Sequence, residues 1–122
     1  MGQISTNDEV ASFLSAFHVK LKCFDIVFRD NRGKNMQALL DLEITPYRRK
    51  EIIEEINIED YSEGPNNDEL YHINDMWVFG RYEKGQEIYI KISMGAPNSS
   101  TICISFHIAE RPMSYPYKKQ QV

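Results

Sequence analysis

Alternating apolar residues dominate the C-terminal half of the chain. They predict three consecutive antiparallel strands, at 75–82, 86–94 and 101–108. Because successive side chains of a strand point to opposite faces, one face of this sheet collects apolar side chains and should be buried. The residues expected on the buried face are Met76, Val78, Ile88, Ile90, Ile92, Ile102, Ile104 and Phe106.

The opposite face of the same sheet carries aromatic, cationic and polar side chains, which makes it a candidate functional site. A solvated face of an antiparallel sheet normally carries Arg, Lys, Ser and Tyr, so an ordinary surface is the alternative. Trp77, Phe79 and Cys103 argue against that alternative, because large apolar groups on such a face need cover from the segment 59–74, from the C-terminal tail or from another protein. The residues expected on this face are Trp77, Phe79, Arg81, Tyr89, Lys91, Ser93, Cys103, Ser105 and His107.

The N-terminal half has the apolar spacing of three and four residues that is typical of helices. Thr6 and Glu9 form a capping-box pattern, which predicts that the first helix begins there. A short strand is expected at 23–29, where the period changes to two. Residues 36–42 are helix-prone, and the Thr-Pro pair at 45–46 begins a further helix. The side chains expected to pack inward from the helices are Val10, Phe13, Leu14, Phe17, Leu21, Ile52, Ile53 and Ile56.

The remaining segments have no clear periodicity. Residues 59–74 are rich in turn formers and are expected to be irregular, and a loop of that length in a compact domain is usually functional or mobile. The ends, at 1–5 and 113–122, are expected to be flexible. The prediction is one α+β domain over 1–122, with N-terminal helices packed on an antiparallel sheet of three to four strands.

Composition limits the partners that the protein can have. The 122 residues carry a formal net charge of -4, so contact with nucleic acid must be local and we expect no binding to DNA by the protein itself. Cys23 and Cys103 lie in apolar settings typical of buried free thiols in a reducing compartment. With no signal-peptide pattern and no run of about 18 apolar residues, we expect a cytoplasmic protein without a membrane partner.

The two C-terminal strands give the chain a family resemblance. The runs Ile-Tyr-Ile-Lys-Ile at 88–92 and Ile-Cys-Ile-Ser-Phe at 102–106 resemble the closing hairpin of the MqsR toxins, the RNA-cleaving half of type II toxin–antitoxin pairs. This resemblance implies a RelE-like fold and an endoribonuclease that cleaves mRNA and is neutralised by a cognate antitoxin protein. Further matching segments lie at 60–65, 70–71, 75–80 and 105–113, and with them the chain looks like a divergent branch that is grouped with these toxins. The resemblance covers about the C-terminal two thirds of the chain.

The resemblance carries over the family's catalytic positions unevenly. Tyr89 matches the tyrosine of the middle strand. Ser62 and His107 stand where the family has lysine, and Val78 stands where it has glutamine. Two interpretations remain open: a rebuilt active site, or a protein that kept the fold and lost or changed the reaction.

The residue types on the polar face suit metal-independent RNA cleavage. This reaction needs a base for the 2′-hydroxyl, an acid for the leaving 5′-oxygen and cations for the charge on phosphorus. Histidine serves as acid or base, arginine and lysine bind phosphate, and tyrosine donates a hydrogen bond or stacks on a nucleobase. The expected catalytic residues are His107, Tyr89, Arg81 and Lys91. The expected substrate-binding residues are Trp77, Ser105, Tyr61, Arg111 and Glu110, of which Glu110 would be a second acid–base group and Arg111 a second phosphate clamp.

Two alternatives compete with this interpretation. A metal site made of His72, Asp75 and His107 is conceivable, but no HExxH motif or paired Cys/His spacing supports it, and we expect no cofactor. The competing function is a non-catalytic interaction module that keeps the toxin-like fold and holds a protein partner with Trp77 and Phe79.

Overall fold

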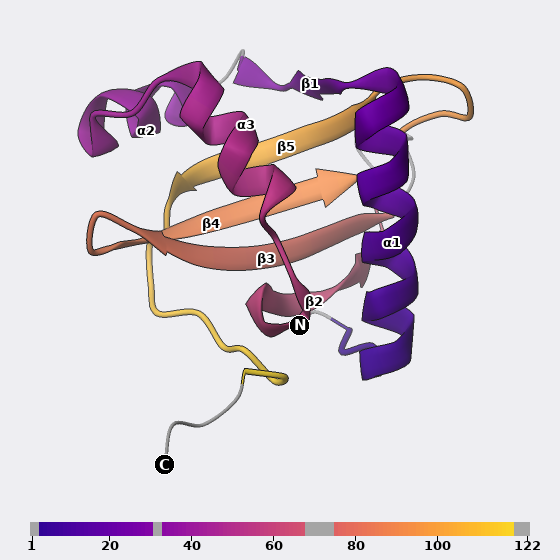
Figure 1. Ribbon diagram of the computed structural model, residues 1–122. Coiled ribbons are helices and arrows are strands. Elements are labelled where there is room, and N and C mark those ends of the chain that lie inside the picture. The colour runs from indigo at the N-terminus through magenta and orange to yellow at the C-terminus, as the bar shows by residue number, and fades with distance from the viewer. Residues whose placement is uncertain (1–2, 31–32, 68–74, 119–122) are drawn as a thin grey trace.

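The computed structural model describes residues 3–30, 33–67 and 75–118, which fold into helices and one five-stranded sheet (Figure 1). The expected α+β class is therefore confirmed for these residues. The helices are α1 (Asn7–Phe24), α2 (Lys34–Leu42), α3 (Pro46–Glu54) and the 3-10 helix η2 (Ile58–Asp60). The strands are β1 (Ile26–Phe28), β2 (Tyr61–Asn66), β3 (Met76–Glu83), β4 (Gln86–Ser93) and β5 (Thr101–Ile108).

The sheet has two more strands than the C-terminal alternation predicts, and it is mixed. Its order is β1-β5-β4-β3-β2, with β1 parallel to β5 and the other pairs antiparallel. The expectation of an antiparallel sheet with three to four strands is therefore wrong. β2 formed within a segment expected to be irregular, because an edge strand tolerates the glycine and proline at positions 64 and 65.

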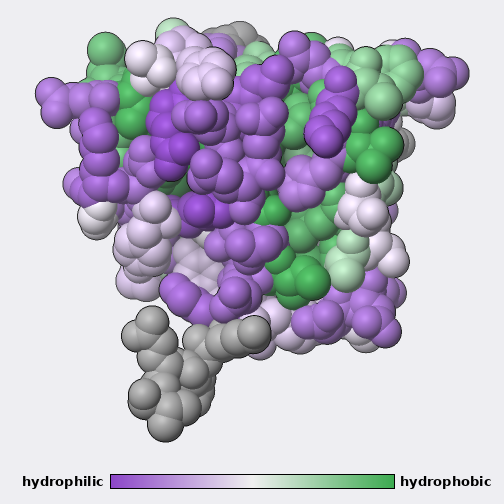
Figure 2. Space-filling model, in the orientation of Figure 1, coloured by the Kyte–Doolittle hydropathy of each residue, from purple (hydrophilic) through white to green (hydrophobic). Residues whose placement is uncertain are grey.

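The core lies between one face of the sheet and the helices α1 and α3, which lie in front of it in Figure 1. The apolar stripe of α1 and the isoleucines of α3 are buried, as expected. On this side of the molecule hydrophilic residues cover most of the surface, and hydrophobic residues gather between α3 and α1 (Figure 2). The opposite face of the sheet is covered by neither α1 nor α3.

The register between β3 and β4 reverses the expected faces of β3. A two-residue turn at Lys84 and Gly85, both with positive φ, connects the strands. Val78 is paired with Lys91 and Phe79 with Ile90, and residues paired across strands share a face. Trp77, Phe79 and Arg81 consequently face the helices, whereas Met76, Val78 and Gly80 lie on the opposite face.

A β-bulge in β5 changes the faces of its first half. Lys91 is paired with Ser105 but Ile92 with Cys103, so Ile104 is the extra residue. Cys103 thereby enters the core, where burial raises the pKa of its thiol to about 12. Ile102 moves to the opposite face. The expected assignments of Ile102 and Cys103 are therefore wrong, because period two alone does not reveal a bulge.

The helix starts agree with the sequence, whereas the end of α1 does not. Thr6 caps α1 through a capping box with Glu9, and Thr45 accepts a hydrogen bond from the Arg48 amide at the start of α3. α1 continues through the first residues of the expected strand 23–29, so Cys23 is exposed on a helix instead of buried.

Parts of both ends make specific contacts, although the sequence suggests flexibility there. The Ser5 amide donates to Tyr61 Oη at 2.8 Å, and Tyr61 Oη donates to the Gly64 carbonyl at 2.7 Å. The Tyr117 ring stacks on Tyr61 with 5.8 Å between ring centroids, and its hydroxyl donates to the Ser5 carbonyl. Tyr61 therefore joins both ends of the described chain to the edge strand β2.

Tyr61→Phe tests this structural role. The substitution leaves the buried Ser5 amide without its acceptor, so we expect the free energy of unfolding in urea to fall by about 1–3 kcal/mol. Tyr82→Phe is the matched control, because Tyr82 is 59% exposed. Equal changes for the two variants would contradict the role given to Tyr61.

Candidate functional site

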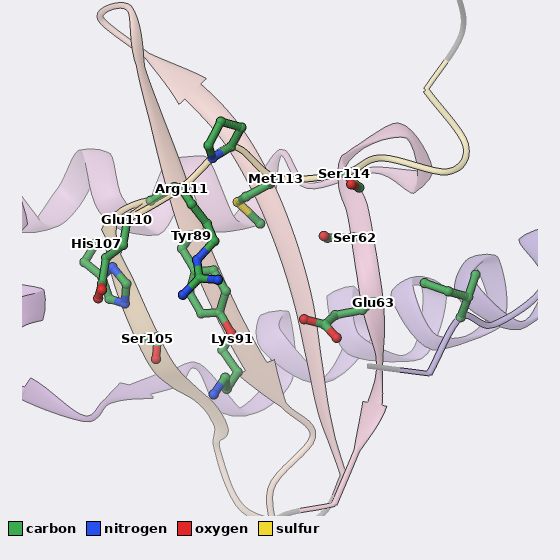
Figure 3. A pocket seen from close by; sticks show the side chains of 13 residues that line it. Ser62, Glu63, Tyr89, Lys91, Ser105, His107, Glu110, Arg111, Met113 and Ser114 are labelled. Carbon is green, nitrogen blue, oxygen red and sulfur yellow. The ribbon is translucent and has the colours of Figure 1, made fainter. Parts of the chain in front are cut away.

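A cleft of about 690 Å³ lies on the face of the sheet opposite α1 and α3 (Figure 3). Its floor comes from β4 and β5, one side from β2, and another from the segment that follows β5. The sequence-predicted residues that line it are Tyr89, Lys91, Ser105, His107, Glu110 and Arg111. The other lining residues are Ile4, Ser62, Glu63, Ala109, Pro112, Met113 and Ser114.

Strand pairing arranges the polar residues of the floor in two rows across the sheet. In one row Lys91 of β4 has Ser105 of β5 on one side, and on the other side Val78 of β3 separates it from Glu63 of β2. In the adjacent row Tyr89 is paired with His107. The two rows bring three of the four expected catalytic residues into one cleft: Tyr89, Lys91 and His107.

His107 is held by its neighbours in a defined orientation. Its ring stacks on Tyr89 with 5.2 Å between centroids and 14° between planes. Its Nδ1 lies 3.0 Å from the Ile108 carbonyl oxygen. A carbonyl only accepts, so Nδ1 carries a proton, and Nε2 is the nitrogen left for proton transfer.

The Tyr89 hydroxyl stays protonated over a wider pH range than an ordinary tyrosine. Burial, and secondarily the negative charge of Glu63, raise the pKa of Tyr89. The Lys91 ammonium lies 5.8 Å from the centroid of the Tyr89 ring. The hydroxyl is therefore suited to donate a hydrogen bond and unsuited to act as a base.

The two residues after β5 differ in what they offer. The Glu110 carboxylate accepts a hydrogen bond from Lys34 Nζ at 2.5 Å, and this bond lowers the pKa of Glu110. Glu110 is thus held ionised, which makes it unsuited to donate a proton. Arg111 is exposed at the cleft, and Figure 3 shows its guanidinium directed toward Tyr89.

Arg81 does not belong to the site. Because of the β3–β4 register it lies on the helix-bearing face, where it donates to the Glu55 carbonyl at 2.6 Å and to Asp60 Oδ2 at 3.2 Å. These bonds tie β3 to the end of α3 and to η2. The expectation that Arg81 shares a face with Tyr89, Lys91 and His107 is therefore wrong.

Trp77 and Tyr61 are likewise absent from the cleft lining. Trp77 stacks on Phe13 of α1 with 4.3 Å between centroids, and both Tyr61 and Phe79 are fully buried. Phe79 and Trp77 are thus covered by the protein's own helix. Of the two residues on which the interaction-module hypothesis relied, Phe79 is fully buried and Trp77 is partly buried.

Glu63 is the ionisable residue of the cleft lining that was not predicted from the sequence. It projects from β2 toward Tyr89 and Lys91, as Figure 3 shows. The resemblance had pointed to its neighbour Ser62 as a family catalytic position, and Ser62 also lines the cleft. Residues 59–74, however, were expected to be irregular, so no side of a strand could be assigned to Glu63. The alternation of buried and partly buried residues in β2 is irregular, so period two gave no signal for it.

Comparison of the chain with protein-family models, with curated proteins and with solved structures finds no match. Within the described residues, no helix is both long and apolar enough to cross a membrane. No group of three or more His, Cys, Asp or Glu side chains in 3–30, 33–67 and 75–118 is placed to hold a metal ion, and His72 lies outside these ranges. The described residues thus form an α+β protein with a cleft that is lined by several ionisable side chains.

Glu63→Gln tests the electrostatic contact across the cleft. Removing the negative charge makes the phenolate of Tyr89 less unfavourable, so the pKa of Tyr89 should fall yet stay above the ordinary value, because burial remains. The measurement is an NMR pH titration of tyrosine labelled with ¹³C at Cζ, with Tyr89→Phe to assign the signal. Glu54→Gln on the exposed side of α3 is the control and should leave the titration unchanged.

Proposed function

We propose that the protein is a metal-independent endoribonuclease that cleaves single-stranded mRNA in this cleft. The observation that carries the proposal is the convergence of His107, Tyr89 and Lys91, with Glu63 and Arg111 at the sides. These residues supply an acid, a base, a hydrogen-bond donor and two cations, which are the groups that the reaction requires.

Glu63 and His107 are placed on opposite sides of Lys91, which suits an in-line displacement. β2 and β5 are three strand spacings apart, about 14 Å between backbones, and the Glu63 carboxylate is directed from β2 toward Tyr89 and Lys91 (Figure 3). Glu63 takes the proton of the 2′-hydroxyl while the 2′-oxygen forms a bond to phosphorus. The bond from phosphorus to the 5′-oxygen breaks, and His107 Nε2 gives its proton to that oxygen. The products are a 2′,3′-cyclic phosphate and a 5′-hydroxyl.

Tyr89, Lys91 and Arg111 stabilise the charge that develops on the phosphoryl oxygens. Lys91 and Arg111 supply positive charge, and the protonated Tyr89 hydroxyl donates a hydrogen bond. Arg111 thus takes the role expected of Arg81. These two cations act locally, which suits a protein with a net charge of -4.

The resemblance to MqsR toxins supports two further parts of the proposal. The first part is that the sheet and its helices have a RelE-like fold. The second is that a cognate antitoxin protein neutralises the ribonuclease activity. Tyr89, the family position that this chain retains, lines the cleft. Ser62 and His107, two positions where it departs, line the same cleft, which favours a rebuilt site over a lost one.

Cleavage of a defined single-stranded RNA by purified protein tests the proposal. We expect cleavage in the presence of EDTA, with cyclic-phosphate ends, and none of the corresponding DNA, which lacks the 2′-hydroxyl. Glu63→Gln and His107→Ala should each lower kcat by about 10²–10⁴-fold, the usual contribution of a positioned acid or base.

Lys22→Gln is the matched control for Lys91→Gln. Lys22 is exposed near the end of α1, away from the cleft, so its variant should cleave like wild type whereas Lys91→Gln should not. A wild-type protein that cleaves no RNA, alone or with ribosomes, would refute the proposal. Equal activity of wild type and His107→Ala would refute the assigned site.

A further inference from the structure

The segment 109–115 is anchored at both ends by a single residue of β4. The Ala109 amide donates to the Glu87 carbonyl oxygen at 2.8 Å. Further along, the Met113 amide donates to Glu87 Oε1 at 3.2 Å, and Tyr115 Oη donates to Glu87 Oε2 at 2.5 Å. The residues between these anchors form a loop that starts and ends on Glu87.

A glycine of the sheet lies directly beneath the loop 109–115. Gly80 is paired with Tyr89 and lies on the cleft face, under Tyr115 and Met113. A Cβ at position 80 would lie 2.3 Å from Tyr115 Oη and 2.9 Å from the Met113 sulfur. A larger residue at position 80 would have to displace the ends of these two side chains.

Arg111 occupies the middle of the loop, between its two anchors. Its guanidinium is directed toward Tyr89 at the floor of the cleft (Figure 3). Binding of phosphate by Arg111 has to fix the backbone of the loop as well as the arginine side chain, so a loop that is already fixed at both ends lowers the backbone part of this cost. Glu87 thus controls where Arg111 lies without lining the cleft itself.

We propose that Glu87 is a positioning residue, which holds the loop 109–115 closed so that Arg111 binds a backbone phosphate of single-stranded RNA. This inference rests on the proposed function and adds the way in which the RNA backbone is held. The hydrogen bonds made by the Glu87 side chain are what matters, and its charge is not required.

Binding of a single-stranded 2′-O-methyl RNA, which cannot be cleaved, tests the proposal. Glu87→Ala removes a negative charge, so simple electrostatics predicts tighter binding of RNA. We expect the reverse, a Kd about tenfold higher, because a charge-assisted contact from Arg111 is lost. Glu87→Gln should bind within about threefold of wild type, because its amide oxygen accepts from Met113 and its amide group donates to Tyr115 Oη.

Two further measurements separate positioning from general damage. Arg111→Gln should lower the slope of log Kd against log salt concentration by about 0.7, one phosphate contact on a single strand, and Glu87→Ala should lower it equally. In the double variant the two losses should not add, because both remove the same contact. Tyr115→Phe, which removes one of the two hydrogen bonds to the Glu87 carboxylate, is a milder second variant. Glu83→Ala, which removes two hydrogen bonds of Arg48 on the opposite face, is the control for loss of a strand carboxylate.

The outcomes distinguish this inference from the proposed function. Cleavage of RNA by wild type with unchanged binding by Glu87→Ala, or additive losses in the double variant, would overturn the inference alone. Binding that depends on Glu87 and Arg111 without any cleavage would support the inference and overturn the proposed function. A wild-type protein that neither binds nor cleaves RNA would overturn both.

Discussion

The pairing register of β3, β4 and β5 decides which side chains enter the core and which line the cleft. The turn at Lys84 and Gly85 sets β3 against β4, and the bulge at Ile104 sets the first half of β5. A shift of one residue would exchange the two faces of a strand. The same register therefore buries the isoleucines of β4 under the helices and leaves Tyr89 and Lys91 on the opposite side.

The two faces use charged residues differently. On the helix-bearing side, cations are bound to carboxylates that hold elements together: Arg49 forms a bidentate pair with Asp30 at 3.0 and 3.1 Å, and Arg81 joins β3 to Asp60. On the cleft side, Lys91 and Arg111 border an open space with Glu63 across from them. The cations of the first face stabilise the fold, and those of the second border the cleft in which we propose that RNA is bound.

Local patterns in the sequence predicted the elements well and their faces less well. The capping residues Thr6 and Thr45 and the three long strands are where the sequence places them, because each depends on neighbours within a few residues. Arg81 and Trp77 were misplaced because β3 has apolar residues on both faces, so only its register with β4 distinguishes them. Glu63 was missed for a related reason: β2 is recognisable only through its pairing with β3, and its own alternation is interrupted.

We propose that RNA binds on the sheet face opposite α1 and α3, over Tyr89 and His107. The most direct measurement is an NMR titration of the ¹⁵N-labelled protein with a short single-stranded 2′-O-methyl RNA. We expect shifts concentrated at Glu63, Tyr89, Lys91, Ser105 and His107, with the His107 imidazole nitrogens among the most affected. Shifts confined to α1 and α3, with β4 and β5 unchanged, would contradict it.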